Sequence, residues 1–285
     1  MFVVTGANGS VGNALVRNLR RAGHATRAVT RDAKRTVVPE GTEVVTGDLT
    51  KAESLRPALH GAQALFLLMT AGDVANRVNL PSVLALARDA GVKRVVVVSS
   101  LLAGTHPHTL PGGGALMGEQ FVRNSGLEWT ILRPWEFASN VMAWVPTIQS
   151  EGVVRVVTSG LPSVAVHPGD IADVAFHALT ESGHARAIYP LTGPEALTPQ
   201  QKAHAISVAL GRELTFIDQN DTQALAELAK QAPDDDSVKL MIPGVCGLES
   251  PAYVPTMERI AGMPARTFQQ WAHEHVNAFR LARSA

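Results

Sequence analysis

The chain contains very little cysteine and has no excess of charge of either sign. Its single cysteine, Cys246, excludes an intrachain disulfide and fits a reducing compartment. Lysine and arginine together number 25, as do aspartate and glutamate, so the formal net charge is zero. No global field therefore attracts nucleic acid or an acidic membrane surface, and we expect a small molecule as the partner.

Long hydrophobic runs are also missing. A membrane-spanning helix needs about 20 apolar residues, and even the run at residues 92–102 is shorter and contains Lys93 and Arg94. Met1 leads directly into a glycine-rich segment, which predicts that the chain carries no secretion signal. These features predict a cytoplasmic protein that does not enter a membrane.

What the chain does have is a regular alternation of strand-like and helix-like segments up to about residue 134. Such alternation is typical of a doubly wound parallel sheet with helices on both faces, the Rossmann arrangement. The expected strands are residues 2–5, 24–30, 42–46, 64–69, 94–100 and 129–133. The expected helices are residues 11–22, a helix opened by a capping box of Thr50 and Glu53, and residues 80–90 and 116–124, with a loop at 105–114.

From residue 134 onward the pattern loosens into a mixture of short strands and helices. Strands are expected near 153–157, 163–166 and 187–191, and helices near 171–179, 199–210 and 266–279, with a surface loop at 233–236. We expect a dinucleotide-binding domain at residues 1–134, with a returning contribution from about 163–192. Residues 135–285 then form a smaller α+β substrate-binding lobe.

The segment TGANGSVG, residues 5–12, links the first strand to the first helix. Gly6 is suited to a tight turn, Gly9 to a close approach by a ligand, and Gly12 to close packing of helix against strand. An ordinary strand-to-helix turn is the alternative, but the position after a first strand and before an amphipathic helix favours a dinucleotide. The residues expected to hold its phosphates are Thr5, Gly6, Asn8, Gly9, Ser10, Val11 and Gly12.

Several segments together resemble a known family. They are TGANGSVG, VVVVSS at 95–100, SGLEWTILRPWEF at 125–137, HPGDIADVA at 167–175 and YPLTGPEALT at 189–198. The chain resembles the atypical short-chain dehydrogenase/reductases, and within them the NmrA-like branch, which includes NADPH-dependent quinone oxidoreductases and redox-sensing regulators. The resemblance spans residues 1 to about 200, and its motifs are specific for fold and cofactor.

The resemblance implies positions for the rest of the cofactor. Asp48 and Leu49 would flank the adenine, and Met69 and Thr70 would line the ribose and the pyrophosphate edge. The residues implied near the nicotinamide are Ser99, Pro134 and Phe137. Beside them, Trp135, Glu136 and Asn140 are the residues expected at the substrate, with packing or solvation as their alternative roles.

The end of the second strand indicates which dinucleotide is preferred. An NAD-binding protein carries an acid at the position of Thr30, whereas here Arg31 follows directly and Lys34 lies close by. This favours NADP(H) over NAD(H). Asp32, about 20 residues beyond Gly12, competes for the acidic role but falls past the strand. A solvated basic turn is the alternative reading of Arg31 and Lys34.

The chain contains only two tyrosines, and this scarcity bears on catalysis. Most short-chain dehydrogenases use a Tyr-x-x-x-Lys pair, but neither Tyr189 nor Tyr253 has lysine four residues later. The catalytic residues therefore stay unassigned, and no metal site is expected. The favoured function is hydride transfer from NADPH to a small quinone-like or conjugated carbonyl acceptor. A non-catalytic NADP(H)-binding redox sensor is the alternative, and a homodimer is left open.

Overall fold

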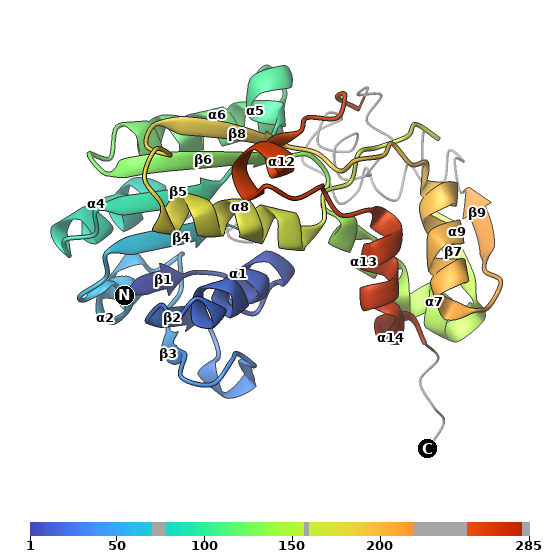
Figure 1. Ribbon diagram of the computed structural model, residues 1–285, viewed down its shortest axis with the longest axis horizontal. Coiled ribbons are helices and arrows are strands. Elements are labelled where there is room, and N and C mark those ends of the chain that lie inside the picture. The colour runs from blue at the N-terminus through green and yellow to red at the C-terminus, as the bar shows by residue number, and fades with distance from the viewer. Residues whose placement is uncertain (70–77, 157–159, 219–249, 281–285) are drawn as a thin grey trace.

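The structure is a computed structural model that describes residues 1–69, 78–156, 160–218 and 250–280 (Figure 1). Its centre is a sheet of seven strands in the order β3-β2-β1-β4-β5-β6-β8, all parallel to their neighbours. The strands are β1 (Phe2–Val4), β2 (Thr26–Thr30), β3 (Glu43–Thr46), β4 (Ala64–Leu68), β5 (Arg94–Val98), β6 (Glu128–Pro134) and β8 (Ala187–Leu191). The predicted doubly wound α/β fold is confirmed.

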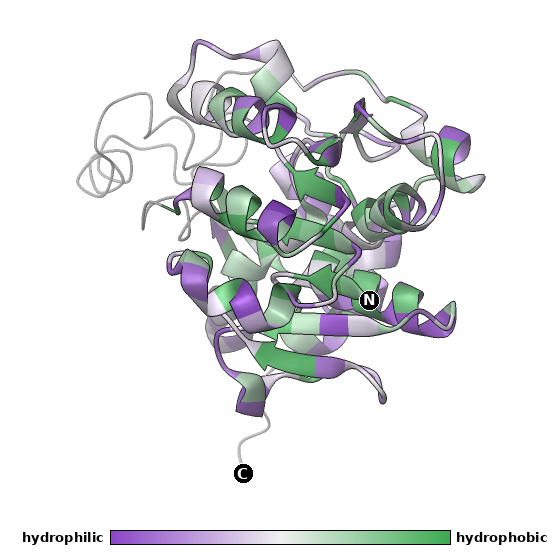
Figure 2. Cartoon of the chain, turned by 90° about the vertical axis from the view of Figure 1, so that its left-hand side faces the viewer, coloured by the Kyte–Doolittle hydropathy of each residue, from purple (hydrophilic) through white to green (hydrophobic). Residues whose placement is uncertain are grey.

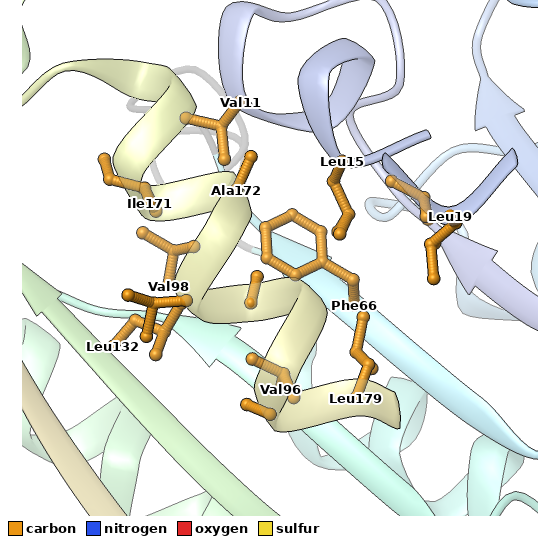
Figure 3. Packing of buried hydrophobic residues seen from close by; sticks show 14 of the residues in the cluster. Val11, Leu15, Leu19, Phe66, Val96, Val98, Leu132, Ile171, Ala172 and Leu179 are labelled. Carbon is orange, nitrogen blue, oxygen red and sulfur yellow. The ribbon is translucent and has the colours of Figure 1, made fainter. Parts of the chain in front are cut away.

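Helices cover both faces of this sheet. On one face lie α1 (Ser10–Arg21) and α8 (Pro168–Thr180), whose apolar residues pack on Phe66 and Leu132 (Figure 3). On the other face lie η2 (Ala52–Leu55), α2 (Arg56–Leu59), α4 (Leu80–Asp89) and α6 (Leu110–Arg123). Buried on both sides, the central strands are almost wholly apolar, as is typical of a parallel sheet. Figure 2 shows this apolar interior beneath helices that are polar on their outer sides.

The remaining elements form a smaller lobe with its own core, which contains Ile148, Ile206, Trp271 and Phe279. Its elements are η3 (Ala138–Trp144), α7 (Val145–Glu151), β7 (Val153–Val156), α9 (Pro199–Leu210), β9 (Thr215–Asp218), α13 (Phe268–Glu274) and α14 (Val276–Phe279). Two of them, β7 and β9, pair in parallel as a separate small sheet. The short α12 (Thr256–Ala261) returns to pack on α8 and β8. This lobe lies beyond the right-hand end of α8 in Figure 1.

Two local expectations in the first half are wrong. Thr50 does not cap a helix, because Oδ1 of Asp48 accepts hydrogen bonds from its backbone N (2.9 Å) and its hydroxyl (2.8 Å), and η2 begins only at Ala52. The stretch expected as a loop at 105–114 contains the end of α5 (Leu102–Thr105) and the start of α6. There Gly112 is needed despite its poor helix propensity, since a Cβ would lie 2.0 Å from the carbonyl oxygen of His106.

Three further differences lie in the second half. The expected strand at 163–166 makes only isolated bridges, Ser163 to Leu197 and Val166 to Phe137, and β9 was not expected at all. The expected helix at 266–279 is broken at His275, whose ring nitrogen lies 2.9 Å from the carbonyl oxygen of Trp271 and ends α13. The loop expected at 233–236 lies outside the described residues.

Candidate functional site

The turn between β1 and α1 has a conformation and a close packing that depend on its three glycines. Gly6 has a φ of +63°, in the left-handed region that favours glycine. A Cβ at Gly12 would lie 2.3 Å from the carbonyl oxygen of Gly6, so the helix can approach the turn only without a side chain there. Gly9, the N-cap residue, leaves the start of α1 without a covering side chain. The turn therefore exposes backbone at the helix N-terminus.

The first N–H groups of α1 are open to a ligand. Each of the other helices of ten or more residues that the structure describes begins with a side-chain cap, from Asn79, Thr109, His167 or Thr198. In α1 the N-cap residue Gly9 provides no side-chain cap, and its carbonyl oxygen accepts only from the backbone N of Asn13 (2.9 Å). The N–H groups of residues 10–12 find no acceptor among the described residues. These N–H groups carry the partial positive charge of the helix dipole. They fit a diphosphate, which supplies several anionic acceptors.

A cavity of about 750 Å³ opens beside this turn. One wall is the glycine turn itself, including Thr5, whose hydroxyl ties β1 to β4 by donating to the carbonyl oxygen of Phe66 (3.1 Å). The opposite wall comes from the residues after β2, and Leu49 closes one side. The side-chain amide of Asn8 donates to the hydroxyl of Thr30 (2.9 Å) and so links the two walls. The cavity has the place and the lining that the adenosine half of a dinucleotide requires.

Of the two basic residues expected to bind the cofactor after β2, only one lines the cavity. Arg31 lines the cavity, whereas Lys34 does not. Asp32 also lines the cavity, but its carboxylate accepts from the backbone N of Lys34 (3.0 Å) and so caps η1 (Ala33–Arg35). Two arginines that the sequence had not indicated, Arg17 and Arg35, line the cavity as well. Arg17 follows Asn13 by one turn on the polar face of α1, which was the only signal for it in the sequence.

Asp48 lies just outside this cavity, while the adjacent Leu49 lines it. The hydrogen bonds from Thr50 lower the pKa of the Asp48 carboxyl group, which therefore stays ionised at neutral pH. Its oxygens stabilise the turn after β3. The role of Asp48 beside the adenine stays a prediction.

The residues expected at the nicotinamide lie at the carboxyl edge of the sheet. Met69 follows β4, Ser99 follows β5, and Pro134 ends β6. Phe137, three residues further, bridges to Val166. Ligands of doubly wound sheets bind at this edge. Thr70 lies outside the described residues.

A buried carboxylate lies behind Ser99. The Glu119 side chain is 1% exposed, and its carboxylate is gripped by the guanidinium of Arg133 through two hydrogen bonds of 2.8 and 2.7 Å. The Ser99 hydroxyl donates to the same carboxylate at 2.8 Å. Since a buried charge is tolerated only when it is paired, this network fixes the ends of β5 and β6 relative to α6.

The residues expected at the substrate have different surroundings. Glu136 forms a buried ion pair with Lys202 of α9 (2.7 Å), so it joins the edge of the sheet to the smaller lobe. The indole N–H of Trp135 donates to the hydroxyl of Ser163 (3.2 Å). Asn140, on η3, is exposed. Of the three, only Asn140 has its side chain free to meet solvent or substrate.

Both tyrosines have hydrogen-bond partners. The Tyr189 hydroxyl lies 2.8 Å from Nδ1 of His184, which precedes β8 and so lies at the amino edge of the sheet. The Tyr253 hydroxyl donates to the carboxylate of Glu258, and partial burial together with that bond raises its pKa to about 12. Neither hydroxyl is poised to transfer a proton at the carboxyl edge.

Other kinds of site find no support in the parts of the chain that the structure describes. In those parts, no cluster of three or more histidine, cysteine or acidic side chains could hold a metal ion. Nor is any helix of the described ranges long and apolar enough to cross a membrane.

Comparison with known proteins identifies the class to which this fold and this site belong. The model of the NAD(P)H-binding family matches residues 6–182, and the chain belongs to that family. It is 36% identical to the (4-alkanoyl-5-oxo-2,5-dihydrofuran-3-yl)methyl phosphate reductase of Streptomyces griseus subsp. griseus, over 98% of this chain and 99% of that one. It is 31% identical to the NAD(P)H azoreductase of Xenophilus azovorans, over 99% of this chain and all of that one.

A solved structure shows the same fold. The NADPH-dependent quinone oxidoreductase of Escherichia coli, solved with NADPH, matches with a TM-score of 0.77 at 22% identity, over 96% of this chain and 99% of that one. The chain is therefore an NAD(P)H-dependent reductase of the atypical short-chain dehydrogenase/reductase type, and the resemblance to the NmrA-like branch is confirmed.

Proposed function

We propose that the protein transfers a hydride from NADPH to a small conjugated acceptor, either quinone-like or a conjugated carbonyl compound. The observation that carries this proposal is the uncapped start of α1, which directly follows the glycine turn that lines the cavity of about 750 Å³. Residues Thr5 to Gly12 would hold the diphosphate, and Leu49 would contact the adenine. Ser99, Pro134 and Phe137 would flank the nicotinamide, which supplies a hydride when the cofactor is bound.

The proposed chemistry of the acceptor rests on the two tyrosines of the chain, neither of which is followed by lysine four residues later. Reduction of an isolated carbonyl group needs a proton as well as a hydride, and Tyr189 and Tyr253 are both engaged elsewhere. Hydride addition to a conjugated system gives a delocalised anion that water can protonate. The protein's residues then need only to orient the acceptor and exclude bulk solvent.

The names of the relatives support the same acceptor class. They describe reduction of an azo compound, of a quinone, and of an alkanoyl-substituted oxo-dihydrofuran. The quinone and the oxo-dihydrofuran carry a C=C bond conjugated with a carbonyl group, and an azo compound carries an electrophilic N=N bond. We infer a conjugated acceptor for this chain, bound between the carboxyl edge of the sheet and the smaller lobe, near Trp135 and Asn140.

We further propose NADP(H) as the preferred cofactor, because Arg31 lines the cavity while Asp32 is occupied in capping η1. A basic group at this place suits the 2′-phosphate of NADP(H). A cytoplasmic location and a homodimer remain predictions.

Turnover with matched acceptors tests this function. The purified protein is mixed with NADPH and, in parallel, with a benzoquinone, an azo dye, a conjugated butenolide and the corresponding saturated ketone. Loss of nicotinamide absorbance is followed in each. We expect turnover with at least one conjugated acceptor and none with the ketone. Tight NADPH binding with no turnover on any acceptor would instead support the redox sensor.

A further inference from the structure

Three arginines from three separate elements converge on the cavity beside the glycine turn. Arg17 comes from α1, Arg31 from the segment after β2, and Arg35 from η1, and all three line the cavity. None of their guanidinium groups forms an ion pair with a residue that the structure describes. The single acid in the lining, Asp32, already accepts from a backbone N–H. With three arginines and one aspartate, the lining carries an excess of positive charge that suits an anionic ligand.

Arg17 lines the cavity from α1, an element separate from the segment after β2 that carries the other two arginines. One turn before it, the side-chain amide of Asn13 donates to the carbonyl oxygen of Val37 (2.8 Å). This bond ties α1 to the segment that follows η1, and Asn13 and Val37 both line the same cavity. The bond fixes the backbone of α1 that carries Arg17, whose exposed side chain lines both this cavity and a neighbouring one. Of the three arginines, the sequence predicts only Arg31 at the adenosine.

We propose that Arg17 is a specificity-determining residue that binds the 2′-phosphate of NADP(H) from the α1 side, completing a clamp with Arg31 and Arg35. The inference rests on the proposed function and extends it to a residue outside the glycine motif. A phosphate monoester carries nearly two negative charges and three acceptor oxygens. Guanidinium groups match this geometry, and several of them can bind one phosphate without competing for the same oxygen.

The test compares Arg17→Ala with Arg21→Ala. Arg21 lies one turn further along α1 and is also exposed. It shares with Arg17 the lining of a neighbouring cavity of about 600 Å³ but does not line the cavity beside the glycine turn. Dissociation constants for NADPH and NADH are measured by calorimetry at one ionic strength. We expect Arg17→Ala to raise the constant for NADPH about tenfold, the change expected for loss of one contact of about 1.4 kcal/mol. The constant for NADH should change less than about twofold, and Arg21→Ala should change neither.

The outcomes separate this inference from the proposed function. A wild-type protein that binds NADH as tightly as NADPH removes the proposed cofactor preference, and the clamp with it. If the wild type prefers NADPH but Arg17→Ala behaves as Arg21→Ala does, the role of Arg17 alone is overturned. Equal losses for both cofactors overturn it too, since they would place Arg17 at a group that the cofactors share. Should Arg17→Ala fail to fold, Arg17→Gln replaces it and the same outcomes apply.

Discussion

Gly12 provides the most direct test of how the glycine turn is built. A Cβ at this position would lie 2.3 Å from the carbonyl oxygen of Gly6 and 2.7 Å from its carbonyl carbon. Real Cβ atoms essentially never approach another heavy atom closer than 3.0 Å. In Gly12→Ala the start of α1 must therefore move away from the turn by at least 0.7 Å, from 2.3 Å to 3.0 Å. The clash is with backbone, so no side-chain rotation relieves it.

The expected cost follows from this geometry. Overpacking a close contact typically costs about 1–3 kcal/mol, and the small gain in helix propensity offsets only part of it. We expect Gly12→Ala to lower the free energy of unfolding by about 2 kcal/mol, or about 4 °C in Tm for a domain of this size. As a control, Gly114→Ala in α6 has no atom within 4 Å of its new Cβ and should be neutral or stabilising by about 0.5–1 kcal/mol.

Gly9→Ser separates stability from binding at the same turn. Its Cβ would lie 3.2 Å from the carbonyl oxygen of Gly6, and the extended backbone of Gly9 suits a serine cap. Stability should change by less than about 0.5 kcal/mol, while the NADPH dissociation constant rises at least about tenfold, because the new side chain covers the open N–H groups. Thermal unfolding and calorimetric titration measure the two effects. Unchanged unfolding of Gly12→Ala, or unchanged binding by Gly9→Ser, would refute the proposed use of the turn.

Further substitutions test the ion pair between Glu119 and Arg133, the side-chain cap of α8 and the cofactor preference. Glu119→Gln leaves Arg133 buried without its counter-ion and should lower stability to urea by about 3 kcal/mol, most of which Glu119→Leu combined with Arg133→Met should restore. Burial lowers the pKa of His167 to about 4 in the folded protein, so the unfolded chain binds the proton more tightly between pH 4 and 6.5 and stability rises with pH across that window. His167→Asn keeps a capping side chain but has no group that titrates between pH 4 and 6.5. The difference in the free energy of unfolding between wild type and variant should therefore change by up to about 3 kcal/mol across this range. Parallel pH profiles of stability would contradict the lowered pKa of His167. Arg31→Ala should weaken NADPH binding at least about tenfold more than NADH binding in parallel titrations, and equal losses would count against a 2′-phosphate at this position.

The order of the main elements could be predicted because each is encoded locally. Apolar residues at helical spacing in α1 and continuous apolar runs in β4 and β5 identify these elements without knowledge of their neighbours. The elements that were missed depend on distant contacts. The pairing of β9 with β7 joins residues about 60 positions apart in the chain, and β9 itself is mostly exposed, which leaves no hydrophobic pattern to detect. Gly112 belongs to the same class, since only its contact with His106 explains a glycine near the start of α6.

The same distinction holds for the candidate site. The positions of Gly6, Gly9 and Gly12 follow from a motif of eight consecutive residues, because a strand-to-helix turn is a local structure. The division of the basic residues could not be predicted. The sequence indicates a basic turn after β2, but which of Arg31, Lys34 and Arg35 lines the cavity depends on the conformation of η1, which Asp32 caps.

The uncapped start of α1 connects stability to function. A side-chain cap typically stabilises a helix by about 1 kcal/mol, and the other long helices that the structure describes all have one. Among the described helices of ten or more residues, α1 alone lacks this contribution, at the place where the dinucleotide phosphates would take the place of the cap. The arginines of the cavity that form no ion pair with a described residue also link stability to binding, because their mutual repulsion in the free protein is relieved when an anion binds. Cofactor binding at this place should therefore stabilise the fold, because the proposed ligand supplies partners for N–H groups and arginines that have none among the described residues.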